Sequence, residues 1–331
     1  MSGLKVVAAG PGVTIQDSGR PDYLRFGVTG AGPMDKAAHA LANRVLGNRP
    51  GAAAIEVSLG GVELEAQGIL TLAVAGGDFA ISRDGRALPG NCIVTLAPGQ
   101  RLRIRSGASG AWCYVAVAGR FDFPPVLGSL SAHTRSGLGP PALAAGQALG
   151  VAAVEMSLDD SMINVDWPPG DVVRVLLGPQ DDYFSPEQIE LFLSSEWRVG
   201  GRSDRMAYAL EGPSLVPAHG FNIVSDGVAE GAIQVPGEGK PIALMADRQP
   251  TGGYPKIANI IGADIRLLAQ KRPGETVRFK AVTHEEAVAA RREAAAQANA
   301  PLSLTPLLRT HFSSEDLLGV NLVGGVVAGE E

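Results

Sequence analysis

The chain has 331 residues, of which 45% are hydrophobic and 19% are charged, and its net charge at pH 7 is −6. This length is typical of about two domains, and a mildly acidic surface disfavours nucleic acid or anionic lipid as a partner. No apolar run approaches the roughly 20 residues of a membrane span, and the N-terminal sequence lacks the pattern of a signal peptide. We therefore expect a cytoplasmic protein with no membrane partner, in which Cys92 and Cys113 are buried thiols.

Many short strands are expected along the chain, because it contains 43 glycines and 23 prolines but few aromatic residues. A Pro-Gly turn followed by a strand-like run with an arginine occurs three times, from Pro98, Pro169 and Pro273. This repeat suggests two similar β-rich halves. Runs of strand-forming residues predict further strands at 69–75, 91–96, 111–118, 172–177, 221–225 and 241–246.

Three helices are predicted from apolar periodicity and end signals. The first spans 34–46, after Pro33 and before Gly47-Asn48. The other two span 186–196 and 284–298, and each follows a capping-box pattern of Ser or Thr with Gln or Glu three residues later. Pro and Gly residues near 139–170 favour a junction between the two halves there.

The stretch "ADRQPTGGYPKIA", residues 246–258, gathers many polar groups on a flexible backbone. Pro255 is expected to begin a short helical turn over 256–261. Two interpretations remain open for the stretch: an ordinary polar turn, or the wall of a binding pocket. The candidate residues are Asp247, Arg248, Gln249, Thr251, Gly252, Gly253 and Tyr254.

Polar residues elsewhere in the sequence also allow two interpretations, one structural and one functional. Arg205 follows Asp204 at the start of a strand-like run, and Gln234 lies in an otherwise apolar run, so its amide must find hydrogen bonds. Asp17 and Arg20 lie in a dense polar segment whose "GAGPMD" turn either binds an anion at a helix N-terminus or simply caps the helix.

Several familiar sites are missing from the sequence. It has no nucleotide phosphate loop and no nucleophile elbow, and its five histidines are scattered without the spacing of metal ligands. We therefore predict no metal site. No Met-Lys-Met biotinylation site is present either, so a biotin would have to be carried by a partner.

The pieces "TIQDSGRP", "GVTGAGPMDKAAHALANRVLGN", "AAIEVSLGG", "HTRSGLG", "SDRMAYALEG" and "IVSDGVAEGAIQVPGEGKPIALMADRQPTGGYPKIANIIGADIRLLAQKRPGETVRF" occur in this order. They resemble the family known as urea-amidolyase-related protein, allophanate hydrolase subunit 2, biotin-dependent carboxyltransferase or KipA. The resemblance runs from about residue 5 to 290. It implies a mainly β fold with a few helices and two cyclophilin-like β-barrel lobes, over 1–165 and 166–290, with a helix end and tail over 291–331.

The resemblance implies a function as the C-type subunit of an ATP-dependent 5-oxoprolinase, which opens 5-oxo-L-proline to L-glutamate. Such a subunit is inactive alone and works with a KipI-like subunit, which is the B-type component, and a subunit-A-like protein. ATP is shared with or supplied by a partner. One alternative is the carboxyltransferase component of a biotin-dependent urea or amide carboxylase, with biotin as cofactor. Another is a regulator that binds a KipI-like kinase inhibitor without catalysis.

Activation of a lactam oxygen needs hydrogen-bond donors aimed at developing negative charge. Under this resemblance Arg205, Asp247, Arg248 and Gln249 are the expected catalytic residues. Substrate binding is expected from Asp17, Arg20, Gln234, Thr251, Gly252, Gly253 and Tyr254.

Overall fold

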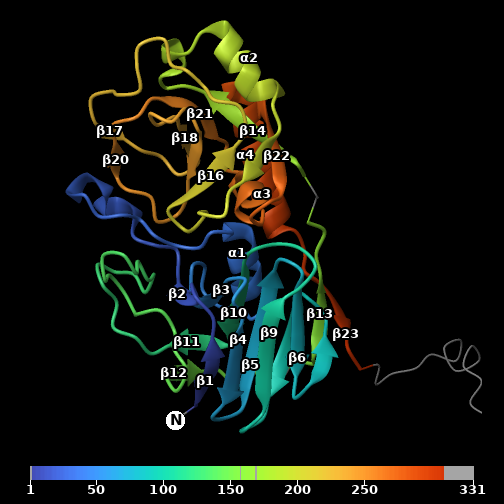
Figure 1. The fold of residues 1–331 in the computed structure, drawn as a ribbon. Coiled ribbons are helices and arrows are strands. Elements are labelled where there is room, and N and C mark those ends of the chain that lie inside the picture. The colour runs from blue at the N-terminus through green and yellow to red at the C-terminus, as the bar shows by residue number, and fades with distance from the viewer. Residues whose placement is uncertain (1, 157, 168–169, 309–331) are drawn as a thin grey trace, which may run out of the picture.

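The computed structural model describes residues 2–156, 158–167 and 170–308, which form two β lobes stacked end to end (Figure 1). The predicted mainly β fold with a few helices is confirmed. The second lobe closes as a seven-stranded barrel, and the first has two seven-stranded sheets.

The two sheets of the first lobe face each other across a hydrophobic core. The first sheet contains, in spatial order, β11 (Gly119–Phe121), β12 (Ala148–Ala153), β1 (Gly3–Ala9), β4 (Val62–Ala66), β9 (Arg101–Ser106), β6 (Phe79–Arg83) and β7 (Arg86–Leu88). The second contains β2 (Thr14–Gln16), β3 (Ala54–Val57), β10 (Cys113–Val117), β5 (Leu70–Gly76), β8 (Cys92–Leu96), β13 (Ser161–Asn164) and β23 (Ser303–Pro306).

The central strands β10 and β5 of the second sheet are buried at every residue. Since alternate residues of a strand point to opposite sides, both faces of the sheet are covered there. In β5, Leu72 and Val74 belong to the core between the sheets. Ala73 and Ala75 belong instead to a second core, which also contains residues of the second lobe. The small alanine side chains leave room for helix α1 (Lys36–Arg44), which packs on this face. The two lobes therefore share one continuous core.

The barrel of the second lobe runs β14 (Val172–Leu177), β21 (Lys256–Ile260), β18 (Ala232–Gln234), β19 (Ile242–Leu244), β16 (Ala207–Glu211), β15 (Trp197–Val199) and β22 (Thr276–Ala281). It closes through a parallel pairing of β14 with β22. A separate two-stranded hairpin pairs β17 (Asp226–Gly227) with β20 (Thr251–Gly252).

The helices begin at residues that the sequence marks. Asp35 caps α1 by accepting the N–H groups of Ala37 and Ala38, both at 3.1 Å. The predicted capping box of α4 (His284–Asn299) is confirmed. The predicted box of α2 (Pro186–Ser194) is wrong, because the Gln188 side chain accepts the N–H of Val216 at 2.8 Å instead. Shorter helical segments are α3 (Ile265–Ala269), η1 (Pro21–Phe26) and η2 (Asp181–Tyr183).

Two local predictions are wrong. Residues 221–225 form a loop, in which Val224 is 92% exposed and so lacks the burial that would favour a strand. Residues 256–261 form no helical turn, because the almost fully buried run 256–260 is strand β21. The three Pro-Gly repeats precede β9, β14 and β22, and the last two are neighbours in one barrel. The repeat therefore does not mark one copy for each lobe.

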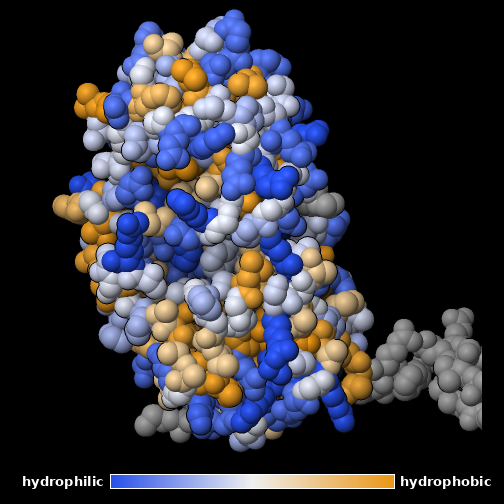
Figure 2. Space-filling view, in the orientation of Figure 1, coloured by the Kyte–Doolittle hydropathy of each residue, from blue (hydrophilic) through white to orange (hydrophobic). Residues whose placement is uncertain are grey.

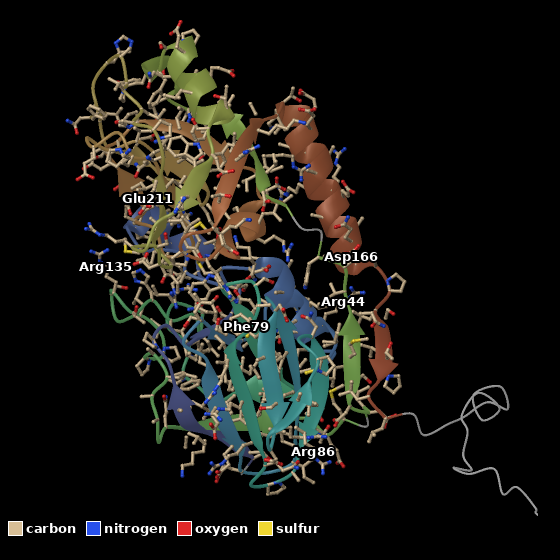
Figure 3. All side chains as sticks on the ribbon, turned by 45° about the vertical axis from the view of Figure 1, so that its right-hand side comes forward. Arg44, Phe79, Arg86, Arg135, Asp166 and Glu211 are labelled. Atoms are coloured by element: carbon tan, nitrogen blue, oxygen red, sulfur yellow. The ribbon has the colours of Figure 1, made fainter. Side chains whose placement is uncertain are left out.

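The chain returns to the first lobe after α4, where β23 pairs with β13. Arg44 at the end of α1 donates to the carbonyls of Ala298 and Ala300, both at 2.6 Å, at the C-terminal end of α4 (Figure 3). Residues 309–331 of the predicted 291–331 helix end and tail lie outside the described residues. In the part of the chain that the structure describes, none of the helices is long and apolar enough to cross a membrane.

Candidate functional site

A cleft of about 580 Å³ lies where the two lobes meet. Hydrophilic residues gather at this level on the face shown in Figure 2. The first lobe contributes residues 27–29 and the segment 133–138, and the second contributes Met206 and residues 247–250. Residues 247–250 of the predicted 246–258 stretch therefore line an inter-lobe cleft.

Arg248 is the buried cation of this cleft. Its side chain is part of the lining and the residue is only 8% exposed, while its Nε donates to the carbonyl of Val228 at 2.9 Å. No carboxylate among the described residues forms an ion pair with it. Burial lowers its pKa, against a smaller opposite effect of Glu230, but an arginine stays protonated at physiological pH. A buried charge without a counter-ion is costly, so this guanidinium is suited to an anionic ligand.

Two further polar atoms of the lining lack partners. His133 is 7% exposed, and its Nδ1 contacts Ser136 Oγ at 2.5 Å, while its Nε2 has no hydrogen-bond partner in the described residues. Thr29 is 5% exposed, and its Oγ1 is likewise without a partner there. Buried polar atoms are nearly always hydrogen-bonded, so two open atoms in one cleft point to a ligand that would satisfy them.

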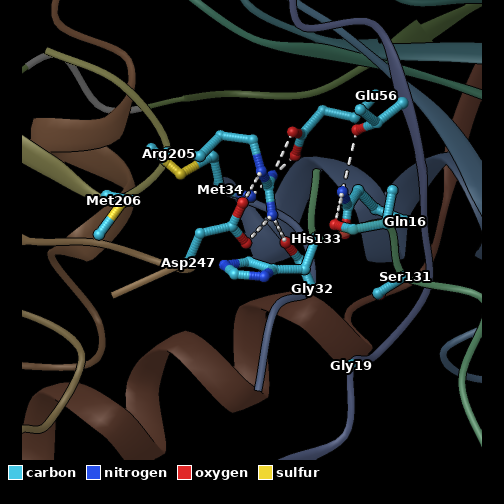
Figure 4. A network of polar contacts seen from close by, with 12 residues as sticks. Gln16, Gly19, Gly32, Met34, Glu56, Ser131, His133, Arg205, Met206 and Asp247 are labelled. Carbon is cyan, nitrogen blue, oxygen red and sulfur yellow. Dashed lines mark hydrogen bonds and ion pairs between the residues drawn. The ribbon is translucent and has the colours of Figure 1, made fainter. Parts of the chain in front are cut away.

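Arg205 and Asp247 form a clamp between the lobes (Figure 4). Arg205 donates from Nε to Asp247 Oδ2 at 2.9 Å and from Nη2 to Asp247 Oδ1 at 2.7 Å. It also donates across the lobe boundary to the carbonyl of Gly32 at 2.7 Å and to Glu56. Burial lowers the pKa of Arg205, but Glu56 and Asp247 outweigh it and raise the pKa above its ordinary value. With four of its five N–H donors used in this way, Arg205 is placed to hold the lobes together and to position Arg248.

Glu56 is the fully buried partner of this clamp in the first lobe. Its second oxygen accepts the N–H of Met34 at 2.9 Å and the hydroxyl of Tyr114 at 2.8 Å. The clamp therefore ends in a carboxylate that is itself fixed by a backbone N–H just before α1 and by a side chain of β10.

Asp17 and Arg20 lie behind the wall of the cleft in the first lobe. Asp17 accepts from Ser131 Oγ at 2.7 Å and from the N–H of Leu130 at 2.7 Å, which fixes the loop that leads to His133. Arg20 is 2% exposed and donates from Nη2 to the carbonyl of Ser131 at 2.5 Å, while its Nη1 has no partner in the described residues. Both residues position the wall rather than line the cleft.

The remaining predicted residues divide between two places. Gln249 lines the cleft beside Arg248. Thr251 and Gly252 belong instead to the β17–β20 hairpin, and Gly253 accepts the N–H of Ile223 at 2.9 Å. Gln234 lies fully buried beneath this hairpin and donates to the carbonyl of Tyr254 at 3.4 Å.

The sequence interpretation missed four residues, namely Thr29, Glu56, His133 and Lys256. Glu56 and His133 stand inside pieces that carry the family resemblance, "AAIEVSLGG" and "HTRSGLG", and this was the available signal. Lys256 lies inside the 246–258 stretch, but a lysine at the start of a strand is usually exposed. It is 2% exposed here.

The glycine-rich turn 30–35 does not offer an anion site. Asp35 accepts the first free N–H groups of α1, so its own carboxylate occupies the position that an anion would take. The described residues also contain no group of three or more His, Cys, Asp or Glu side chains arranged to hold a metal ion.

Comparison with known proteins gives the family. The family model of the carboxyltransferase domain, subdomain A and B, matches residues 26–281. The chain is 36% identical over 283 residues to the C subunit of 5-oxoprolinase from Haemophilus influenzae, covering 85% of this chain and 91% of that protein. It is 35% identical over 295 residues to the C subunit of 5-oxoprolinase from Escherichia coli, covering 88% of this chain and 94% of that protein.

Larger proteins contain a similar region. Urea amidolyase of Saccharomyces cerevisiae is 30% identical over 311 residues, which are 85% of this chain but 17% of that protein. The solved structure of K. lactis urea amidolyase matches with a TM-score of 0.83 and 25% identity, over 90% of this chain and 20% of that one. The solved structure of TTHA0988 matches with a TM-score of 0.78 and 33% identity, over 85% of this chain and 55% of that one. The chain therefore belongs to the carboxyltransferase family with subdomains A and B.

Proposed function

We propose that this chain is a subunit of an ATP-dependent 5-oxoprolinase, which opens 5-oxo-L-proline to L-glutamate together with a KipI-like subunit and a subunit-A-like protein. The two relatives named as the C subunit of 5-oxoprolinase support this assignment, because they are matched over 91% and 94% of their own length. The urea amidolyase match covers only 17% of a much longer protein.

One observation carries the proposal at the level of chemistry: Arg248 is a buried cation in the cleft with no carboxylate partner among the described residues. The substrate of the proposed reaction carries one carboxylate and one ring amide. An arginine fork matches the carboxylate, and it holds the small ring against the other lobe. Thr29 Oγ1 and His133 Nε2 then offer hydrogen bonds to the ring amide.

ATP is assigned in this proposal to a partner subunit or to the interface with it. The helix N-terminus most suited to a phosphate, at α1, is already occupied by Asp35. The role proposed for this chain is to bind the lactam, orient its ring amide and exclude water from it. No step of phosphate transfer is assigned to its residues.

The test is reconstitution of the three-protein system. The chain is purified with a KipI-like subunit, the subunit-A-like protein is added, and glutamate release from 5-oxo-L-proline is measured with and without ATP. ATP-dependent release that requires this chain supports the proposal. A firm complex that releases no glutamate contradicts it.

A biotin-linked carboxyltransferase is the second candidate, and the family match and the urea amidolyase similarity favour it. In that case a carboxylated biotin on a partner would donate its carboxyl group to urea or a similar amide. The same purified complex is then tested for carboxylation of urea by carboxybiotin. If the complex shows neither activity, the remaining hypothesis is a non-catalytic regulator that binds a KipI-like inhibitor.

A further inference from the structure

His133 and Ser136 form a hydrogen-bonded pair in the lining of the inter-lobe cleft. His133 Nδ1 lies 2.5 Å from Ser136 Oγ, and the N–H of Ser136 donates to the carbonyl of His133 at 3.2 Å, which closes a tight turn. Ser136 is exposed, whereas His133 is only 7% exposed. One imidazole nitrogen is therefore held by a surface hydroxyl, while the other, Nε2, is buried without a partner in the described residues.

The backbone on both sides of His133 is fixed by hydrogen bonds to other segments. The N–H of His133 donates to the carbonyl of Leu138 at 2.8 Å, which pairs the two ends of the turn. The N–H of the preceding residue, Ala132, donates to the carbonyl of Ile15 at 2.9 Å. The imidazole is thus held both through its backbone and through Ser136.

Cationic side chains share the lining with the open nitrogen. The charged residues of the lining are Arg135, Asp247 and Arg248. Both carboxylate oxygens of Asp247 accept from Arg205, so they are already used. A proton on Nε2 would point a donor at other donors, whereas a bare Nε2 presents a lone pair to them. The charges of the cleft therefore favour the tautomer with its proton on Nδ1, where the oxygen of Ser136 accepts it.

We propose that Ser136 holds His133 in the Nδ1–H tautomer and thereby makes Nε2 the general base that takes a proton from the N–H of the bound amide. His133 is the catalytic residue in this step, and Ser136 is a positioning residue. The N–H bond breaks, its electron pair stays on the amide, and the proton is bound at Nε2. Negative charge develops on the amide oxygen, to which the Thr29 hydroxyl donates. The imidazolium and this oxygen become charged together, so the net charge of the cleft does not change.

This inference deepens the proposed function, on which the identity of the amide rests. An amide or a urea that loses its N–H proton is a stronger nucleophile, at oxygen or at nitrogen. The same base therefore serves the opening of a lactam and the carboxylation of urea. The tautomer of His133 does not depend on which of the two reactions the chain performs.

The first measurement reads the tautomer in the full chain, without ATP or partner subunits. The five histidines are labelled with ¹⁵N, and long-range ¹H–¹⁵N spectra are recorded at about pH 8.5, where an ordinary histidine is neutral. The signals of His133 are assigned by their loss in His133→Gln. We expect the proton on Nδ1 in the wild-type chain.

Ser136→Ala removes the acceptor of this proton, so the tautomer ratio should move about fivefold toward Nε2–H. Ser136→Thr keeps a hydroxyl and should keep the wild-type ratio. Ser194→Ala is the matched control, because it removes an exposed hydroxyl outside the cleft, and it should also keep the wild-type ratio. A wild-type His133 with its proton on Nε2, or a ratio that Ser136→Ala leaves unchanged, overturns the inference.

The second measurement uses the reconstituted enzyme. Ser136→Ala should lower kcat about tenfold and change KM less than about twofold, because the tautomer governs proton transfer rather than binding. Ser136→Thr should restore most of kcat, and the melting temperatures of both variants should remain close to that of the wild type. An unchanged kcat in a Ser136→Ala chain whose tautomer has shifted would refute His133 as the base.

Failure of this inference and failure of the proposed function are distinguishable. The tautomer is read without turnover, so a wrong tautomer overturns the inference and leaves the proposed function standing. Absence of glutamate release from the wild-type complex contradicts the proposed function alone. In that case kcat of the same variants is measured for the carboxylation of urea, with the same expected ratios.

Discussion

Arg205 and Asp247 face each other through two parallel hydrogen bonds, Nε to Oδ2 at 2.9 Å and Nη2 to Oδ1 at 2.7 Å. Both residues belong to the second lobe, but two further donors of Arg205 reach Gly32 and Glu56 in the first. The geometry therefore makes this pair a joint between the lobes. Arg248, which follows Asp247 in the chain, is placed at the cleft by that joint.

Replacement of Arg205 by Met should destabilise the fold. Removing one partner of a buried ion pair leaves Glu56 and Asp247 as uncompensated charges, which costs about 3–5 kcal/mol. Unfolding in urea should therefore show a lower midpoint concentration, and the free energy of unfolding derived from it should fall by that amount. Arg278→Met is the matched control, because its pair with Glu196 is exposed on both sides and contributes little. An Arg205→Met chain with wild-type stability and no activity would instead assign Arg205 to catalysis.

The fold was predictable from the sequence because its signals are local. Pro-Gly turns, alternating apolar residues and capping residues each act over a few positions, as the confirmed box at Thr283 and Glu286 shows. The strand predicted at 221–225 was wrong because the signal there was also only local. Its apolar residues fit a strand, but in the folded chain Val224 is 92% exposed.

The candidate site was predictable only in part, because a cleft depends on contacts between distant residues. Arg248 and Gln249 stood out as polar residues beside glycines. His133 joins them across a separation of more than a hundred residues, which no local pattern reports. The burial of Lys256 likewise depends on a hairpin strand that begins 30 residues earlier, at Asp226.

Thr29→Val should weaken the use of 5-oxo-L-proline without lowering the stability of the fold. The substitution keeps the shape of the side chain and removes a buried hydroxyl that has no partner in the described residues, so the free energy of unfolding should change by less than about 1 kcal/mol or rise. In the reconstituted enzyme kcat/KM for 5-oxo-L-proline should fall about tenfold. Thr276→Val, which lies outside the cleft lining, serves as the control for both measurements. Unchanged kinetics in Thr29→Val would remove the hydroxyl from the site.

The stability of the protein should fall between pH 7 and pH 5 because of His39. Burial lowers the pKa of His39, against smaller opposite effects that include its hydrogen bond to the Gln16 carbonyl. Above the unfolded-state pKa of about 6.5 both states are neutral and stability is complete. As the pH falls further, the unfolded state binds a proton that the folded state does not, and up to about 1.4 kcal/mol is lost per pH unit.

His39→Gln removes this titration, so its melting temperature should depend less steeply on pH than that of the wild type, whatever its absolute value. His284→Gln, at the exposed start of α4, is the control and should keep the wild-type slope. Parallel curves for wild type and His39→Gln would contradict the assignment.

The two cysteines should be unreactive in the folded protein. Burial raises the pKa of Cys92 to about 12, with a smaller contribution from Asp160, and burial raises that of Cys113 well above its usual range. At pH 8 only about one Cys92 in ten thousand is then a thiolate, the form that reacts. With Ellman's reagent we expect almost no reaction in buffer and two thiols per chain in denaturant. A thiol that reacts in buffer as fast as free cysteine would refute the burial described here.

The most direct test of the central claim is the kcat/KM of the reconstituted enzyme for 5-oxo-L-proline with Arg248→Gln in place of the wild-type chain. Loss of the buried guanidinium should lower kcat/KM at least about a hundredfold, mainly through KM, because the carboxylate loses its partner in both ground and transition state. The melting temperature and the assembly with the KipI-like subunit should remain close to those of the wild type. Wild-type kinetics from a folded and assembled Arg248→Gln chain would contradict the claim that this cleft holds the substrate.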